Sequence, residues 1–291
     1  MKSPISNIVS SQSSSRNILF VMSENMNDVN NNPSAFNSEL FYILEQECRN
    51  KSYSLFYAVL GDQNNLAALI NGNHFAGIIF VSYVPKEVLD QCVQMRLPAI
   101  CLNNRHEKMV SIVPEDQRGS YEAVQYLQEQ GHKKIGIILG KREYYSTIER
   151  FTGYTAAMLN NSLEIDSRCV LEGEWTFDGA RNAILNMLDS IPKEELPTAM
   201  FCCSDMMAIG AMDALKERNI SIPREVSVMG FDNVQQSNYV YPRLTTVSID
   251  VKLMAELAIE KLSLHDEEAD PRGYLILIPA VLEKRQSVAE I

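Results

Sequence analysis

The stretch AMFCCSDMMAIGAMDALKERNISIPREVSVMG, residues Ala199–Gly230, decides the fold. It opens on a short apolar run, Ala199–Cys203, and closes on a second run, Glu225–Gly230, both of strand length. Between the two runs, apolar residues recur at helical spacing over Met206–Arg218, and Pro223 follows soon after as a stop signal. A strand, a helix and a second strand in this order predict a βαβ unit, in which the two strands lie parallel.

The same alternation of strand and helix continues on both sides of this stretch. The predicted strands are Ile18–Ser23, Tyr53–Val59, Gly77–Ser82, Ala99–Leu102, Lys134–Leu139, Arg168–Leu171, Ala199–Cys203 and Glu225–Gly230. The predicted helices are Ser34–Cys48, Gln117–Gln130 and Met206–Arg218. Continuous apolar runs such as GIIFV are typical of central strands that are covered on both faces. A polar segment near Ser111–Asp116 interrupts the rhythm, which favours two parallel sheets of about four or five strands over one large sheet.

Length and composition narrow the class of protein. At ~150 residues per domain, 291 residues predict two domains. Hydrophobic residues make up 46% and charged residues 22%, which is ordinary for a soluble globular protein and excludes a disordered or collagen-like chain. The net charge of −11 argues against a face that binds nucleic acid, because such a face is normally basic.

The sequence also bears on compartment and on metal binding. No apolar run approaches the ~18 residues of a membrane span, and the first residues contain no apolar core of a secretory signal. The six cysteines form no CxxC pair and no Cys/His metal spacing. We therefore expect a cytoplasmic protein with reduced cysteines, no membrane partner, no metal and no cofactor.

Ligands of open α/β sheets bind beyond the carboxyl ends of the strands. The residues at these ends are mostly polar and include the only Trp of the chain: Ser23-Glu24-Asn25, Gly61-Asp62, Ser82-Tyr83, Asn103-Asn104-Arg105, Gly140-Lys141, Glu174-Trp175, Ser204-Asp205 and Asp232-Asn233. Carboxylates and amides can pair with hydroxyl groups, and an aromatic ring can cover the C–H face of a sugar, so a neutral polyhydroxylated ligand fits this set. Simpler explanations stay open: Asp205 can be a helix cap, and Trp175 can be a packing residue.

Catalytic motifs give little support to an enzyme. The chain has no G-x-S-x-G elbow, no phosphate-binding loop, no H-E-x-x-H and no G-x-G-x-x-G after a strand. The four histidines are scattered, and His132 is explained as a cation at a helix C-terminus. Cys202 and Cys203 lie in an apolar strand, where a buried structural thiol is the expected state. We therefore expect a binding protein rather than an enzyme.

The residues from Phe201 to Val247 form a dense set of motifs. They are Ser204-Asp205, Met207-Ala208, Gly210-Ala211, Pro223, Glu225-Val226-Ser227-Val228, Gly230-Phe231-Asp232, and Pro242 followed by Leu244-Thr245-Thr246-Val247. Glu149-Arg150 with Gly153-Tyr154, and Gly173-Glu174-Trp175, add to the set. In this combination the chain resembles the effector-binding core of the lactose/galactose-repressor (LacI/GalR) family of bacterial transcription regulators.

The resemblance implies a periplasmic-binding-protein-like α/β fold. It consists of two Rossmann-like lobes with parallel sheets, joined by three crossovers near Val113–Glu115, Thr246–Asp250 and Arg272–Leu275. The N-terminal lobe would be residues 17–113 plus 248–272, including a helix at 251–262. The C-terminal lobe would be residues 114–247 plus 273–291, with Tyr274–Leu282 as its last strand. Residues 1–16 would be a flexible tail or the stub of a linker.

The resemblance also implies where an effector binds, namely in the cleft between the lobes. Arg150 and Asp232 are the strongest predicted contacts, and Trp175 stands where the family often places a ring against the ligand. Ser204 stands where many sugar-binding members have Asn. The remaining predicted contacts are Asp205, next to Ser204, and Ser23 and Asn25 on the opposite wall. Pro114-Glu115 departs from the Asp-Asn of many members, so no contact is assigned there.

The expected partners are a small-molecule effector, most simply a sugar, and a second copy of the chain. The resemblance implies that the dimer seam is the helix Ser34–Cys48, with a contribution from the C-terminal lobe. Family members begin with a helix-turn-helix, and nothing before Ile18 can form one. We therefore expect this chain to reach operator DNA only through a missing N-terminal domain. A stand-alone sugar-binding protein, a sugar-acting enzyme and a purine-responsive regulator stay open as alternatives.

Overall fold

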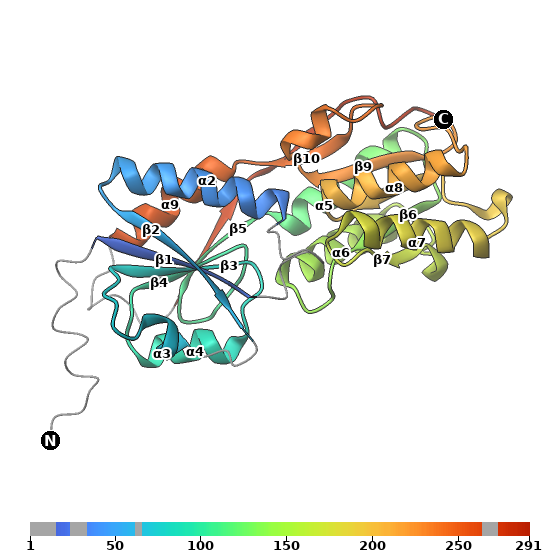
Figure 1. Ribbon diagram of the computed structural model, residues 1–291. Helices are drawn as coiled ribbons and strands as arrows, with labels where there is room; N and C mark the ends of the chain where they lie inside the picture. Colours follow the sequence, from blue (N-terminus) through green and yellow to red (C-terminus); the bar gives the residue numbers. More distant parts are fainter. Residues whose placement is uncertain (1–15, 24–33, 62–65, 264–272) are drawn as a thin grey trace, which may run out of the picture. The chain divides into compact units, whose positions relative to one another are not determined.

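The computed structural model describes residues 16–23, 34–61, 66–263 and 273–291 (Figure 1). The chain divides into two compact units. Unit 1 contains residues up to Pro114 together with Asp250–Ile278, and unit 2 contains Glu115–Ile249 together with Pro279–Ile291. Each unit is built around its own six-stranded sheet. In the described part of the chain, no helix is long and apolar enough to span a membrane.

The sheet of unit 1 is parallel throughout, with the strand order β11-β5-β4-β3-β1-β2. Its strands are β1 (Asn17–Ser23), β2 (Ser54–Leu60), β3 (Gly77–Val81), β4 (Ala99–Leu102), β5 (Val110–Pro114) and β11 (Leu275–Ile278). Helices α2 (Ala35–Asn50) and α9 (Val251–Ser263) cover one face, and α3 (Leu66–Ile70) and α4 (Lys86–Gln94) cover the other (Figure 1). Both faces of β1 and β3 are therefore buried, which explains why these strands are apolar without alternation.

The sheet of unit 2 has the order β12-β10-β9-β8-β6-β7, and only the β10–β12 pair is antiparallel. Its strands are β6 (Ile135–Leu139), β7 (Val170–Glu172), β8 (Ala199–Cys202), β9 (Ser227–Asp232), β10 (Thr245–Ile249) and β12 (Ala280–Glu283). Helices α5 (Asp116–Glu129) and α6 (Tyr145–Asn160) pack on each other, as do α7 (Phe177–Ser190) and α8 (Asp205–Glu217). Unit 2 thus repeats the βαβ rhythm predicted from Ala199–Gly230.

The end of the chain corrects one prediction. Tyr274–Leu282 is not a single strand of unit 2 but two strands that belong to different sheets. β11 pairs with β5 of unit 1, and β12 pairs with β10 of unit 2. Pro279 lies between them, and its missing N–H ends the first ladder. The last passage between the units therefore comes after Ile278 rather than near Arg272–Leu275. The other two passages, after Pro114 and after Ile249, fall within the segments predicted for them.

Two strands were missed, so each sheet has more strands than predicted. The segment near Ser111–Asp116, read as a break, is the end of β5 and the start of α5. β10 contains Thr and Ser, which hid its position in the middle of a sheet.

Arg168 and Cys169 lie in a 3₁₀ turn, so β7 begins only at Val170. Residues 1–15 and Asn25 lie outside the described residues.

Candidate functional site

The carboxyl ends of β8 and β9 in unit 2 carry the candidate site. Strand β8 ends at Cys202, and Ser204 caps the helix that follows by accepting a hydrogen bond from the main-chain N–H of Met207 at 3.2 Å. This cap starts α8 directly after the strand and leaves the carbonyl of Cys203 at the sheet edge. Asp232 ends β9, the neighbouring strand, in a left-handed conformation with φ of 110°. Two neighbouring strands therefore deliver acceptor oxygens to one place.

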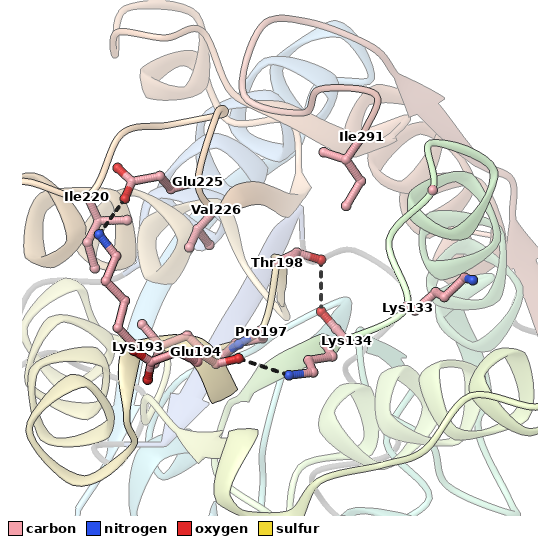
Figure 2. A pocket seen from close by; sticks show the side chains of 12 residues that line it. Lys133, Lys134, Lys193, Glu194, Pro197, Thr198, Ile220, Glu225, Val226 and Ile291 are labelled. Carbon is pink, nitrogen blue, oxygen red and sulfur yellow. Dashed lines mark hydrogen bonds and ion pairs between the residues drawn. The ribbon is translucent and has the colours of Figure 1, made fainter.

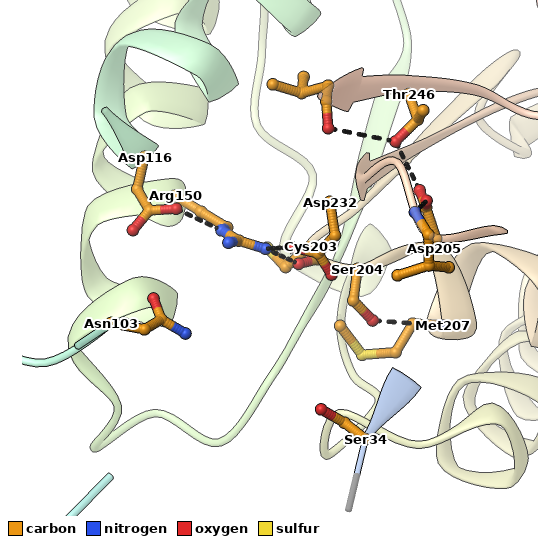
Figure 3. Close-up of polar contacts among 12 residues, drawn as sticks. Ser34, Asn103, Asp116, Arg150, Cys203, Ser204, Asp205, Met207, Asp232 and Thr246 are labelled. Atoms are coloured by element: carbon orange, nitrogen blue, oxygen red, sulfur yellow. Dashed lines mark hydrogen bonds and ion pairs between the residues drawn. The ribbon is translucent and has the colours of Figure 1, made fainter. Parts of the chain in front are cut away.

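Arg150 reaches these oxygens from α6 and is 2% exposed (Figure 3). Its Nη1 donates to Asp232 Oδ1 at 3.1 Å and to the carbonyl oxygen of Cys203. Its Nε donates to Oδ1 of Asp116, the first residue of α5, at 2.7 Å. Burial alone would lower the pKa of Arg150, but the charges of Asp116 and Asp232 outweigh burial and hold that pKa above its ordinary value. The guanidinium is thus a fixed, permanently charged group.

Aromatic rings enclose this guanidinium. The Phe231 ring centre lies 3.7 Å from Arg150 Cζ, and the Trp175 ring centre lies 5.6 Å from it. Tyr144 stacks on Trp175 with ring centres 6.3 Å apart. Gly140 makes room for the indole, since a Cβ there would lie 2.0 Å from it. The buried indole Nε1 of Trp175 has no hydrogen-bond partner among the described residues, which is uncommon for a buried donor.

Asp205 has a different environment from Asp232. It is fully buried, with Oδ2 accepting from the main-chain N–H of Val234 at 2.8 Å and Oδ1 accepting from the hydroxyl of Thr246. Burial, and then the charge of Asp232, raise the pKa of Asp205 well above its ordinary value. Both carboxyl oxygens are bonded inside the protein, which favours the simpler of the two sequence interpretations, a structural role at the start of α8.

The carboxyl edge of the unit 1 sheet carries a second polar cluster. Ser23 ends β1 and is buried. The Ser82 hydroxyl, just after β3, donates to Asn37 Oδ1 at 3.1 Å, and Asn103 Nδ2, just after β4, donates to Ser82 Oγ at 3.4 Å. Within the described residues, Asn37 Nδ2 and Asn103 Oδ1 have no partner. Ser82 and Asn103 belong to the predicted strand ends, whereas Asn37, one turn into α2, was not predicted.

Three further contacts of Arg150 were also missed, namely Asp116, the Cys203 carbonyl and the Phe231 ring. Asp116 was read as part of a polar break, and it lies 34 residues from Arg150 in the sequence. The only available signal was an acidic residue at a helix start, which the helix dipole explains equally well.

A pocket of about 450 Å³ opens at the opposite, amino-terminal edge of the unit 2 sheet (Figure 2). Lys134 and Thr198, which precede β6 and β8, line it. Lys134 Nζ donates to the Glu194 carbonyl at 3.2 Å, and Lys193 Nζ lies 2.8 Å from Glu225 Oε1. Because these lysines are already paired inside the protein, we assign no ligand to this pocket.

The sequence of residues 124–288 matches the periplasmic binding protein-like domain family. The chain belongs to this family. Curated relatives include the "Probable HTH-type transcriptional repressor ExuR" of Bacillus subtilis (strain 168), 29% identical over 83% of this chain and 72% of the relative. The HTH-type transcriptional repressor PurR of Actinobacillus pleuropneumoniae serotype 3 (strain JL03) is 30% identical over 72% of this chain and 64% of the relative. This periplasmic binding protein-like chain is thus an effector-binding core of the LacI/GalR type, and these relatives are named as repressors rather than enzymes.

Solved structures confirm the fold. A LacI family transcriptional regulator from Enterococcus faecium with bound ribose superimposes with a TM-score of 0.81 at 23% identity, covering 94% of this chain and 99% of the other. A periplasmic binding protein/LacI transcriptional regulator from Alkaliphilus metalliredigens QYMF, complexed with D-xylulofuranose, gives a TM-score of 0.77 at 23% identity, with 94% and 99% covered. The α/β fold with two parallel-dominated sheets, predicted from the sequence, is that of these regulators.

Proposed function

We propose that this chain is the effector-binding and dimerisation domain of a cytoplasmic bacterial transcription regulator, and that its effector is an uncharged sugar. The observation that carries the proposal is the grouping of Arg150, Asp232 and Trp175 at the carboxyl edge of one parallel sheet. A guanidinium donates to sugar oxygens, a carboxylate accepts from hydroxyl groups, and an indole ring covers the apolar C–H face of a sugar.

The predicted contacts take different roles in this proposal. Arg150, Asp232 and Trp175 touch the effector, and Ser204 lies beside them at the start of α8. Asp205 holds the sheet edge in place instead of touching the effector, since both of its oxygens are bonded within the protein. Ser23 and Asn25, which the family resemblance adds to the contacts, belong to the N-terminal lobe and complete the set of proposed contacts.

The names of some relatives and the descriptions of some structural neighbours mention sugars. One curated relative is the ribose operon repressor of Haemophilus influenzae, 28% identical over 80% of this chain and 70% of its own length. Two structural neighbours are described with bound ribose or D-xylulofuranose, and a third is a complex of the regulator CelR with cellobiose. These ligands share hydroxyl groups and carry no charge, which matches the groups around Arg150.

Effector binding would change DNA binding by a shift between two arrangements of the lobes. A ligand shifts such an equilibrium only by its difference in affinity for the two arrangements. An N-terminal helix-turn-helix would read the operator, and the dimer would set the spacing of its two heads. The net charge of −11 is unfavourable for contacts between these residues and DNA phosphates.

A thermal-shift screen combined with Trp175 emission tests the proposal. We expect at least one uncharged sugar, such as ribose or cellobiose, to raise the melting temperature and to change the emission of the only Trp in the chain. A ligand at about 100 times its Kd stabilises by ~2.7 kcal/mol, which is easily detected. Stabilisation by purines alone would instead favour the purine-responsive alternative, and an effector that leaves the emission unchanged would remove Trp175 from the site.

A gel-shift experiment separates a regulator from a stand-alone sugar-binding protein. Placed behind a helix-turn-helix head of a relative, the chain should make operator binding respond to the sugar found in the screen. The chain by itself should give no specific band at ~100 mM salt, because affinity for DNA begins with Lys and Arg on phosphates. A fusion that binds its operator equally well with and without the sugar would contradict a regulatory role.

A further inference from the structure

Arg150 uses two of its three guanidinium nitrogens inside unit 2. Nε donates to Asp116 Oδ1 at 2.7 Å, and Nη1 donates to Asp232 Oδ1 at 3.1 Å as well as to the Cys203 carbonyl (Figure 3). Over the described part of the chain, no group accepts a hydrogen bond from Nη2. The hydrogen-bonding capacity that Arg150 can offer to a ligand is therefore concentrated on this one nitrogen.

This pattern decides which ligand groups Arg150 can hold well. A carboxylate or phosphate binds a guanidinium most strongly through two parallel N–H···O bonds. The side-on fork needs Nε together with Nη2, and the end-on fork needs Nη1 together with Nη2. Asp116 blocks the first fork, and Asp232 with the Cys203 carbonyl blocks the second. A single oxygen, such as that of a sugar hydroxyl, needs only Nη2.

The charges around Arg150, like its hydrogen bonds, favour an uncharged ligand over an anionic one. The Asp116 side chain is fully buried, and the Arg150 side chain is 2% exposed, so water screens their interaction little. The one positive charge of Arg150 is within ion-pair distance of two carboxylates, Asp116 and Asp232. An anionic ligand approaching Arg150 would also meet the carboxylates of Asp116 and Asp232. A ligand without charge pays no such electrostatic penalty.

We propose that Asp116 sets the charge selectivity of this site, so that it accepts uncharged sugars and rejects sugar acids and sugar phosphates. The inference rests on the proposed function and adds the class of sugar to it. Asp116 acts through Arg150 and is therefore a positioning residue, whereas Asp232 is the carboxylate expected to touch the sugar. Asp205, at the start of α8, does not share this role, because it bonds to Val234 and Thr246 and not to an arginine.

Quenching of Trp175 emission tests the charge effect without any knowledge of the effector. The Trp175 ring centre lies 5.6 Å from Arg150 Cζ, so the ratio of iodide quenching to acrylamide quenching reports the local charge. At constant ionic strength, Asp116→Asn should raise this ratio about twofold, the effect of one unit charge within roughly a Debye length. Asp116→Glu keeps the charge and should restore the original ratio. Asp189→Asn removes an exposed carboxylate that pairs with Arg218 and should leave the ratio unchanged.

Matched pairs of sugars test the selectivity itself. Galactose with galacturonate and glucose with glucuronate differ only in one carboxylate, and ribose with ribose 5-phosphate differ in a phosphate. In thermal-shift titrations of the unaltered chain, stabilisation should come from an uncharged member and not from its charged partner. Asp116→Asn, and Asp116→Ala, which also frees Nε, should gain binding of a charged member by about tenfold or more, equivalent to ~1.4 kcal/mol.

The outcomes distinguish failure of this inference from failure of the proposed function. A charged sugar that stabilises the unaltered chain better than its uncharged partner overturns the inference while leaving a sugar effector in place. An unchanged quenching ratio in a folded Asp116→Asn variant also overturns it. If no sugar stabilises the chain, the proposed function fails, and the quenching ratio still decides whether Asp116 controls the charge at Arg150.

Discussion

Asp205 accepts a hydrogen bond from the main-chain N–H of Val234 at 2.8 Å and another from the hydroxyl of Thr246. One buried carboxyl group thereby joins the start of α8, the turn that follows β9, and strand β10. Gly230 allows this approach, because a Cβ at that position would lie 2.2 Å from Asp205 Oδ1. The hydrogen bonds of Asp205 therefore hold in place the edge of the unit 2 sheet from which Asp232 contacts Arg150.

Replacing Asp205 tests this structural role. Asp205→Ala leaves the N–H of Val234 and the hydroxyl of Thr246 without their acceptor, so the free energy of unfolding should fall by about 2–4 kcal/mol. Asp205→Asn should cost much less, because the raised pKa of Asp205 means that the site already favours an uncharged group. Urea unfolding followed by circular dichroism measures both. Asp213→Ala, on the exposed side of the same helix, should change little. If Asp205→Ala and Asp205→Asn lowered the free energy of unfolding equally, an uncharged acceptor at this position could not be what stabilises the fold.

Asp232→Asn should weaken binding of the sugar found in the screen while the domain stays folded. Removing one partner of a buried, charge-assisted contact costs about 2–5 kcal/mol in comparable interfaces. Isothermal titration calorimetry measures the loss of affinity, and circular dichroism checks folding. Asp189→Asn serves as the control, since it removes the same charge from an exposed ion pair. Normal affinity in Asp232→Asn would remove this residue from the site.

Arg150→Ala should abolish sugar binding and also destabilise unit 2. The substitution leaves the carboxylates of Asp116 and Asp232 without the cation that they share. Breaking a buried ion pair by removing one partner typically costs ~3–5 kcal/mol. Thermal unfolding should therefore move to lower temperature in Arg150→Ala but much less in Asp232→Asn. A variant of normal stability that still binds the sugar would refute both roles of Arg150.

His132 corrects an interpretation and yields a pH prediction. It is not a surface cation at a helix end but is 1% exposed, with Nε2 donating to the Ala289 carbonyl at 3.1 Å and Nδ1 lying 3.0 Å from the Thr198 hydroxyl. Burial lowers its pKa below the ordinary 6.5, against the opposing effect of the Ala289 carbonyl. The unfolded chain thus binds a proton at higher pH than the folded chain does.

The sign of the effect follows from this difference in proton binding. The stabilising contribution of neutral His132 is complete above pH ~6.5 and is lost as pH falls below that value toward the lower pKa of the folded state. The urea midpoint should fall between pH 7 and pH 5, and His132→Gln should remove part of that fall. A slope that is the same with and without His132 would contradict the prediction.

The sequence predicted the fold where apolar pattern and local stop signals agree. The helix predicted at Met206–Arg218 is α8, shifted by one residue at each end, with Ser204 as its N-cap and Arg218 as its C-cap. The pattern failed at β5 and β10, whose buried Ser and Thr hydroxyls find partners only in three dimensions: Ser111 accepts from the N–H of His106, and Thr246 donates to Asp205. Such partners, 5 and 41 residues away, leave no trace in local hydropathy.

Some residues of the candidate site, like some elements of the fold, could be predicted from the sequence, and others could not. Arg150, Asp232, Trp175 and Ser204 follow from strand ends and from the family motif, and the structure gathers the first three around one guanidinium. Asp116 could not be predicted, because its contact with Arg150 depends on how α5 packs against α6. Asp205 has the same residue type as Asp232 and a similar position, and only its hydrogen bonds to Val234 and Thr246 distinguish it from the carboxylate that we propose to touch the effector.

The last prediction concerns the dimer, for which helix α2 was the candidate seam. Phe36 and Leu40 are buried in unit 1, and Phe41 packs against Tyr57 with ring centres 5.8 Å apart. The exposed aromatic side chains here include Tyr42, which is 62% exposed on α2, and Phe56, which is 48% exposed on the edge strand β2. Aromatic side chains that stay exposed are enriched at interfaces between subunits.

Glutamate at these two positions should separate the subunits. In Tyr42→Glu and Phe56→Glu, dimer formation would bury a charge without a partner, so the mass measured by light scattering should fall from that of a dimer to that of a monomer at tens of micromolar. Leu159→Glu, at a position that is 65% exposed on α6 of unit 2, provides the comparison, because it introduces the same charge away from helix α2 and strand β2. A monomeric unaltered chain at the same concentration would refute dimerisation, and a dimer that persists in both variants would place the interface elsewhere.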